Sequence, residues 1–125
     1  MKLPIFLFSR GSFGHHGDKN TFSNKYKIAV QGGAKEIIIR RVCLDCTSNH
    51  SQIYYKRVRN LSNFEIYSTF IEQWTETNNK HNEDFYMYST IYQALRDKDG
   101  DRWRFCNFDY SSGNVGFPRD CGPKE

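Results

Sequence analysis

Four cysteines and a histidine form the part of this sequence whose spacing most directly suggests chemistry. Cys43 and Cys46 are separated by two residues in the stretch RRVCLDCTSNHSQIYYKR, His50 follows them, and Cys106 and Cys121 lie towards the C-terminus. A Cys-x-x-Cys pair serves as a redox-active dithiol, as half of a zinc site or as a disulfide. Each of these three uses requires different neighbouring residues, so the residues that flank the pair indicate which use applies.

The flanking residues argue against redox chemistry and against zinc. A redox-active pair usually begins a helix whose N-terminus stabilises a thiolate, whereas TSNHSQIYY after Cys46 favours a turn and a strand. Zinc needs four ligands. Cys43, Cys46 and His50, with Cys106 or Cys121, would supply them, but no second Cys-x-x-Cys knuckle is present. We therefore favour two disulfides, and a small zinc-stabilised nucleic-acid-binding domain stays an alternative.

Four cysteines allow three pairings. We favour Cys43–Cys46 and Cys106–Cys121, because the second bond would then close the C-terminal loop and hold the tail on the sheet. Crossed pairings, which would tie the hairpin to the last strand, stay open. Disulfides persist in oxidising compartments, so the favoured pairing predicts a protein that is secreted or lies on the extracellular surface.

Two sequons agree with that location. Asn49 and Asn60 each begin an Asn-x-Ser triplet without proline and are candidate glycosylation sites. No apolar stretch approaches the roughly 18 residues of a membrane span. The opening MKLPIFLFSRG is too short for a standard secretory signal, and we expect any signal to have been removed ahead of Met1.

Three carboxylates in DKDGD are candidate calcium ligands. Asp97, Asp99 and Asp101 match the first half of an EF-hand loop, but Arg102 and Phe108 stand where that loop needs glycine and a bidentate glutamate. An EF-hand is therefore excluded. A looser calcium site remains as one interpretation, and a solvated Asp-Gly turn as the other.

Aromatic and polar residues near the C-terminus form the candidate ligand-binding set. Aromatic rings pack on the apolar face of a pyranose, while amide, carboxylate and guanidinium groups take its hydroxyls. The set comprises Trp103, Asn107, Asp109, Tyr110 and Asn114, together with Arg57 from the hairpin. Core packing is the alternative for Trp103.

A basic hairpin and a histidine pair suggest two other functions. The hairpin carries Arg40, Arg41, Lys56, Arg57 and Arg59 beside tyrosines, a combination that binds nucleic acid or acidic glycans or simply faces solvent. A net charge of +4 and a pI near 8.9 do not favour nucleic acid. His15, His16 and Asp18 are candidates for a small hydrolase. Known catalytic motifs are absent from the sequence, and we predict that the protein is not an enzyme.

The elements that must position these residues are mainly strands. Alternating and β-branched runs predict strands over 25–30, 35–44, 52–59 and 102–108. Residues 9–24 and 118–125 are expected to be irregular, 64–77 helical, and 84–97 a strand followed by a short helix. The predicted fold is a single compact, mainly β, antiparallel β-sandwich-like domain over 25–125, stapled by disulfides, with one or two short helices and a loop-rich segment over 1–24.

The sequence thus predicts an extracellular ligand-recognition module. Carbohydrate is the favoured ligand, in a lectin-like and glycosylated protein with calcium as the candidate cofactor. The expected partner is a glycan or glycoprotein, with no membrane span. The main alternative is a structural subunit of a larger assembly, whose exposed aromatic residues would be contact surface.

Overall fold

A computed structural model describes residues 5–9, 19–108, 117–118 and 120–124. Its helices and strands are β1 (Ile5–Ser9), α1 (Lys19–Gln31), β2 (Ile37–Val42), β3 (Gln52–Arg57), β4 (Phe85–Tyr88), α2 (Ile91–Arg96), β5 (Phe105–Asn107) and β6 (Asp120–Gly122). Short helical turns lie at Ser48–His50, Ser68–Glu72 and Asp99–Asp101.

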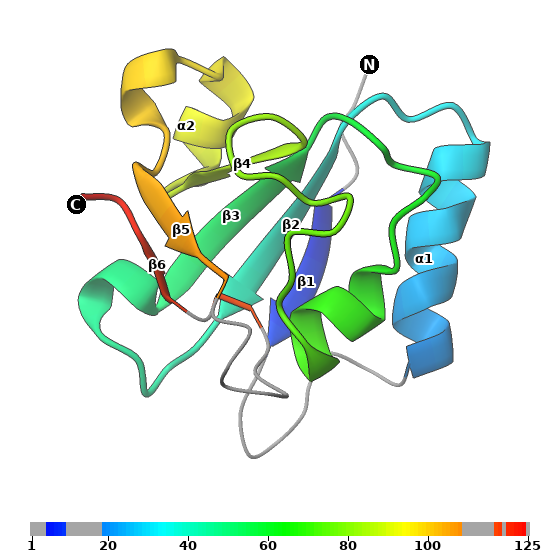
Figure 1. Cartoon of the computed structure of the whole chain (residues 1–125), viewed down its shortest axis with the longest axis horizontal. Coiled ribbons are helices and arrows are strands. Elements are labelled where there is room, and N and C mark those ends of the chain that lie inside the picture. Colours follow the sequence, from blue (N-terminus) through cyan, green and yellow to red (C-terminus); the bar gives the residue numbers. More distant parts are fainter. Residues whose placement is uncertain (1–4, 10–18, 109–116, 119, 125) are drawn as a thin grey trace.

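The described strands form two sheets (Figure 1). In the larger one the order is β1-β2-β3-β4, with β1 parallel to β2 and the other neighbours antiparallel. The parallel pair is joined by α1, because two parallel strands need a crossover. The smaller sheet is the antiparallel pair β5-β6. Antiparallel pairing was predicted from the sequence and is confirmed, but the fold as a whole is a small α/β arrangement.

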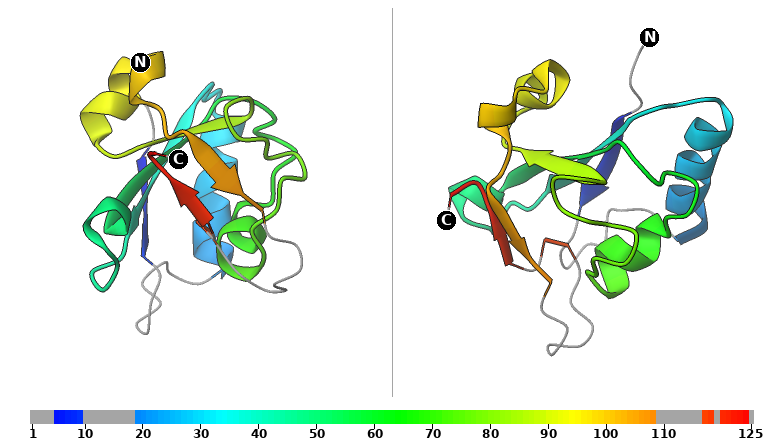
Figure 2. Two further views of the ribbon diagram at one scale, coloured as in Figure 1. Left: turned by 60° about the vertical axis from the view of Figure 1, so that its left-hand side comes forward. Right: turned by 45° about the horizontal axis from the view of Figure 1, so that its top comes forward.

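Helices cover both faces of the larger sheet. Helix α1 and the segment 61–74 pack on one face, where the side chains of Ile37, Ile39 and Tyr55 enter the main core. Helix α2 covers the other face above Ile38 and Tyr54. Figure 2 shows α1 and α2 on opposite sides of the sheet. The sandwich expected from the sequence is not confirmed, because helices and loops rather than a second large sheet complete the layers.

Helix α1 corrects two predictions, since 19–24 was expected to be loop and 25–30 a strand. Phe22 and Tyr26 are buried on one face, with Val30 packed beside them, a spacing of four residues that suits a helix. The helix ends in a Schellman motif, in which Gly33 has φ +94° and Ala34 N donates to the carbonyl of Ala29 at 3.0 Å. The two glycines after Gln31 are therefore a helix cap.

The helix predicted over 64–77 is confirmed only in part, over 66–72. Only one wide turn, Ser68–Glu72, follows a short helical start, and Gln73 is already extended at φ −152°. Phe70 and Trp74 are nevertheless buried. The spacing of the apolar residues therefore indicated which side chains enter the core, but not a helix over the whole segment. Farther along, the strand and short helix predicted over 84–97 are confirmed by β4 and α2.

Both favoured disulfides are present. Cys43 is bonded to Cys46, and Cys106 to Cys121. The second bond joins β5 to β6, so the tail predicted to be irregular over 118–125 contains a strand at Asp120–Gly122. The four cysteines are thereby all used, and the zinc alternative loses its thiolate ligands. Disulfides agree with an extracellular location.

Candidate functional site

Arg57, which the sequence places among the ligand-binding residues, is fully buried in the main core. Its guanidinium donates to the hydroxyl of Tyr55 at 3.0 Å, to Asn79 Oδ1 at 2.8 Å and to the carbonyl of Asn60 at 3.1 Å. It also donates to the carbonyl of Asn78 and stacks 3.7 Å from the centre of the Phe64 ring. The side chain organises two loops and does not reach the surface.

Trp103, the central aromatic residue of the predicted set, is only 1% exposed. Its indole Nε1 donates to Ser89 Oγ at 3.0 Å, and its ring meets His50 edge to face at 5.4 Å between centres. The structure therefore places Trp103 in the core, as the alternative interpretation held. Its face is not open to a sugar.

Of the remaining residues of the predicted ligand set, the structure describes only Asn107. Asn107 is exposed on β5 and donates to Asp120 at 3.3 Å. Asp109, Tyr110 and Asn114 lie outside the described residues, and so do His15, His16 and Asp18, the candidates for hydrolase chemistry.

The basic hairpin does not form the surface expected from its sequence. Arg41, Lys56 and Arg57 are buried, whereas Arg40 is partly exposed and Arg59 is exposed. Lys56 Nζ donates to the carbonyl of Ala94 at 2.8 Å, which docks the end of α2 on the sheet. Because helices and loops cover both faces of the sheet, the side chains of Arg41, Lys56 and Arg57 contact other parts of the fold instead of solvent.

The three carboxylates proposed as calcium ligands are paired with cations. Asp97 lies 3.2 Å from Arg102 and 3.7 Å from Lys56, Asp99 lies 3.2 Å from Arg102, and Asp101 lies 3.1 Å from Arg96. Burial would raise the pKa of Asp97, but a hydrogen bond from Tyr88 and the nearby cations hold it below its usual value. Within the described residues, no group of three His, Cys, Asp or Glu side chains could hold a metal ion.

The two sequon asparagines are both exposed but differ in their contacts. Asn60 has a left-handed backbone at φ 55°, and its Nδ2 donates to Asp84 at 3.0 Å. Asn49 lies in the helical turn Ser48–His50, and no hydrogen bond from its side chain to a described residue is found. Its amide is therefore the more accessible of the two.

His50 joins the two disulfide-bonded regions. Its Nε2 lies 2.7 Å from the carbonyl of Cys121, and its Nδ1 lies 3.3 Å from the hydroxyl of Thr47. A carbonyl oxygen can only accept, so Nε2 carries the proton in this bond. Arg41 adds a hydrogen bond to the His50 carbonyl at 3.2 Å. The turn after β2 is thus fixed against β6.

A groove of about 400 Å³ runs between that fixed turn and the start of α2, and we name it the hydroxyl groove. One wall is formed by Ser48, Asn49, Ser51 and Gln52, and the other by Ser89, Thr90, Ile91 and Tyr92. Tyr54 lies between them and is mostly buried, whereas Tyr92 is 74% exposed. Sequence reasoning placed these residues in a turn, a strand and the start of a short helix, and it did not bring them together because they come from separate segments.

Local hydrogen bonds hold the polar walls in place. Thr90 caps α2 by accepting from Gln93 N at 3.1 Å, and Ser51 Oγ donates to the carbonyl of Ser48 at 3.1 Å. The hydroxyl of Tyr54 donates to Gln52 Oε1 at 3.2 Å. Each of these groups keeps at least one further donor or acceptor site for a ligand.

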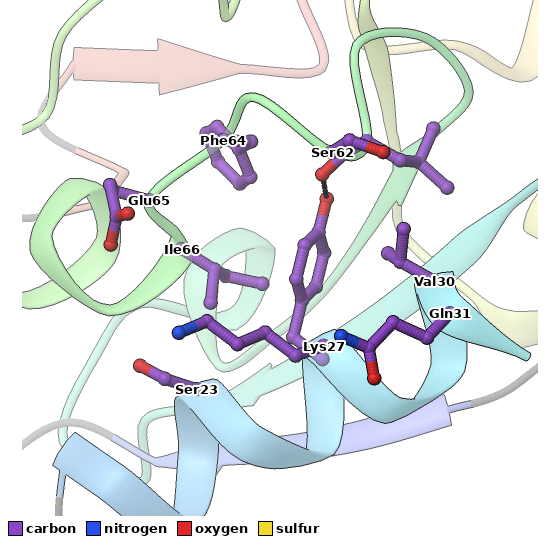
Figure 3. Close-up of a pocket in the computed structure, with 10 residues that line it drawn as sticks. Ser23, Lys27, Val30, Gln31, Ser62, Phe64, Glu65 and Ile66 are labelled. Atoms are coloured by element: carbon purple, nitrogen blue, oxygen red, sulfur yellow. Dashed lines mark hydrogen bonds between the residues drawn. The ribbon is translucent and has the colours of Figure 1, made fainter.

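A second groove, of about 390 Å³, lies between α1 and the segment 61–66 (Figure 3). Tyr26 forms part of it, and its hydroxyl donates to the carbonyl of Leu61 at 2.6 Å. Burial raises the pKa of Tyr26 to about 12, so this hydroxyl stays protonated at neutral pH. The groove has a mixed lining of Val30, Phe64 and Ile66 beside Lys27 and Glu65, with no clear chemical preference.

Comparison of this chain with protein-family models, with curated proteins and with solved structures finds no match. Neither α1 nor any other helix in the described part of the chain has the length and apolar character needed to cross a bilayer. The function must therefore be argued from the geometry of the site.

Proposed function

We propose that this protein is a secreted, non-catalytic carbohydrate-recognition module that binds its ligand in the hydroxyl groove. The observation that carries the proposal is the lining of the groove, in which every side chain is uncharged and hydroxyl and amide groups lie beside two tyrosine rings. Sugar hydroxyls both donate and accept hydrogen bonds, as Ser, Thr, Asn and Gln do in return. The apolar face of a pyranose can pack on the exposed ring of Tyr92.

The size and the frame of the groove support binding of a small ligand. Its volume of about 400 Å³ lies within the range of roughly 300–1,000 Å³ typical of such sites. One wall is attached to the Cys43–Cys46 turn and to His50, which contacts β6. A wall fixed in this way loses little conformational freedom on binding, and that favours affinity.

The direct test is a glycan array probed with protein produced without N-glycosylation, followed by titration calorimetry on the best ligand. Running the array with calcium and with a chelator tests the candidate cofactor at the same time. We expect Tyr92→Ala to weaken binding roughly tenfold, about 1.4 kcal/mol, because the stacking ring is lost. Leu95→Ala is the matched control, since Leu95 is also exposed on α2 but does not line the groove.

Two results would overturn the proposal. One is a blank array in both conditions. The other is a ligand whose affinity is the same for wild type and Tyr92→Ala, since that ligand would bind elsewhere.

An assembly subunit is a second candidate function, favoured by one observation. Leu44 is 90% exposed at the tip of the Cys43–Cys46 turn, and Ile28 is 68% exposed on α1. Exposed apolar side chains of this kind, one of them on a disulfide-closed turn, suit a protein contact. Light scattering after size exclusion should then show an oligomer that Leu44→Asp dissociates, and a monomer at all concentrations would count against self-assembly.

A further inference from the structure

Another groove, distinct from the one beside α1, adjoins the hydroxyl groove, and we name it the basic groove. It has a volume of about 640 Å³, and its charged lining consists of Arg102, Arg104, Lys124 and Asp101. It lies on the side of the molecule where α2 and the C-terminal strand are found (Figure 1). With three cations and one carboxylate, the basic groove carries a net positive charge, whereas the hydroxyl groove is lined by uncharged side chains.

Two of the three cations are available to a ligand. Arg102 is held by Asp97 and Asp99, each at 3.2 Å, and stacks 3.8 Å from the centre of the Tyr86 ring. Arg104 and Lys124 are exposed, and neither forms an ion pair with a residue that the structure describes. The local carboxylate, Asp101, is already paired with Arg96 at 3.1 Å.

Arg104 and Lys124 both line the basic groove and flank the two strands of the smaller sheet. Arg104 immediately precedes β5, and its amide donates to the carbonyl of Gly122 at 3.2 Å. Lys124 follows β6 by two residues. The Cys106–Cys121 bond fixes this pair of strands, so the two side chains are presented from one braced hairpin.

Ser89 connects the two grooves, because it lines both of them. Its Oγ accepts from the indole of Trp103 at 3.0 Å, which leaves the hydroxyl hydrogen free to be donated. Its backbone amide donates to Gln93 Oε1 at 3.1 Å, and Gln93 lines the basic groove. A chain of sugar units could therefore pass from one hollow to the other over a single hydroxyl.

We propose that the ligand of this protein is an acidic oligosaccharide. A neutral sugar occupies the hydroxyl groove, and a carboxylate or sulfate group on a neighbouring sugar is bound by Arg104 and Lys124. This inference rests on the proposed carbohydrate-binding function and specifies its substrate class. Charge-assisted hydrogen bonds to these two cations supply affinity that a neutral analogue lacks.

The test compares one neutral oligosaccharide with its uronate-containing and sulfated derivatives by titration calorimetry. We expect at least one derivative to bind about tenfold tighter than the neutral parent, and the comparison of the two identifies the acid. The double variant Arg104→Gln/Lys124→Gln should lose this advantage and keep the affinity for the neutral parent. Lys25→Gln/Lys35→Gln is the matched control, since it removes the same charge from exposed positions elsewhere and should behave as wild type.

The outcomes separate this inference from the function on which it rests. If the neutral parent binds in a Tyr92-dependent manner but neither derivative binds more tightly, only the acidic-ligand inference fails. It also fails if the control variant loses the advantage equally, since net charge alone would then explain the effect. If the neutral parent does not bind, and single-stranded nucleic acid binds as tightly as the acidic sugars and does so without Tyr92, both proposals fail.

Discussion

Arg57 places a positive charge inside an aromatic core without an ion pair to any carboxylate that the structure describes. Burying a charge costs several kcal/mol unless hydrogen bonds replace its hydration. Here the guanidinium fork is matched by oxygen atoms of Tyr55, Asn79, Asn60 and Asn78. The residue ties the loops after β3 and before β4 to the sheet.

We expect Arg57→Met to destabilise the protein by about 3 kcal/mol, because the oxygen of the Tyr55 hydroxyl and the carbonyls of Asn60 and Asn78 would lose the donor that Arg57 supplies. Urea unfolding followed by fluorescence measures the change in the free energy of unfolding. Arg59→Met is the control, because Arg59 is exposed and should change stability by no more than about 0.5 kcal/mol. Equal stabilities for the two variants would show that the network contributes little.

His81 gives the fold a specific pH dependence. Its Nε2 is buried without a hydrogen-bond partner in the described structure, and its ring lies 5.4 Å from that of Phe85. Burial lowers the pKa of His81 from 6.5 to about 4. Between these two values the unfolded chain binds a proton that the folded protein does not, so stability must fall as the pH drops.

Above pH 6.5 we expect His81 to leave the free energy of unfolding unchanged. As the pH falls from 6.5 to about 4, the free energy of unfolding should decrease progressively. Urea midpoints across this range measure the effect, and His81→Phe should flatten the slope because it cannot be protonated. The contribution of Asp97 is lost only at lower pH, since its pKa lies below 3.8. An unchanged slope in His81→Phe would contradict the assignment to His81.

At the scale of elements, the two disulfides brace different parts of the site. Cys43–Cys46 links two residues that are three apart in the sequence, just before the segment 48–52 that forms one wall of the hydroxyl groove. Cys106–Cys121 spans fifteen residues and holds β5 to β6, the two strands that Arg104 and Lys124 of the basic groove flank. The entropy that a disulfide removes from the unfolded chain grows with the loop that it closes.

We therefore expect Cys106→Ser/Cys121→Ser to cost about 3 kcal/mol and Cys43→Ser/Cys46→Ser to cost less, about 2 kcal/mol. Thermal unfolding of the two double variants gives the order, and the reduced wild type should be less stable than either. The opposite order would mean that the turn after β2 matters for the whole fold through His50. Circular dichroism at low temperature checks that both variants fold.

For the whole molecule, glycosylation and ligand binding should compete. Asn49 is a sequon residue and also lines the hydroxyl groove, so a glycan attached there would lie at the site. Asn60 is outside this groove, and its amide is held by Asp84. The modification state at Asn49 would then decide whether the groove is open.

Protein secreted by glycosylating cells should carry a glycan at Asn49 and bind free oligosaccharide at least tenfold more weakly, about 1.4 kcal/mol, than protein made without glycosylation. Peptide mass spectrometry identifies the modified asparagine, and calorimetry measures the affinity. Ser62→Ala is the control, because it removes only the Asn60 sequon and should not restore binding. Full affinity in protein glycosylated at Asn49 would place the ligand site elsewhere.

The local chemistry of this protein was determined by the sequence alone. The triple isoleucine run predicted β2, the pattern over 84–97 predicted β4 followed by α2, and the cysteine spacing favoured both disulfides. Each of these features depends on residues near one another in the sequence, such as a β-branched run, a short helical pattern or a closable loop. Local interactions of this kind act in the same way whatever the rest of the chain does.

Only the tertiary structure decided which charges and rings are inside. Trp103 and Arg57 looked like ligand contacts in sequence, yet they are buried because helices and loops cover both faces of the sheet. Residues 25–30 alternate like a strand, but packing of Phe22 and Tyr26 against the sheet makes them helical. The walls of the hydroxyl groove come from segments about forty residues apart. Contacts between distant segments depend on how the elements pack, so local sequence patterns did not reveal them.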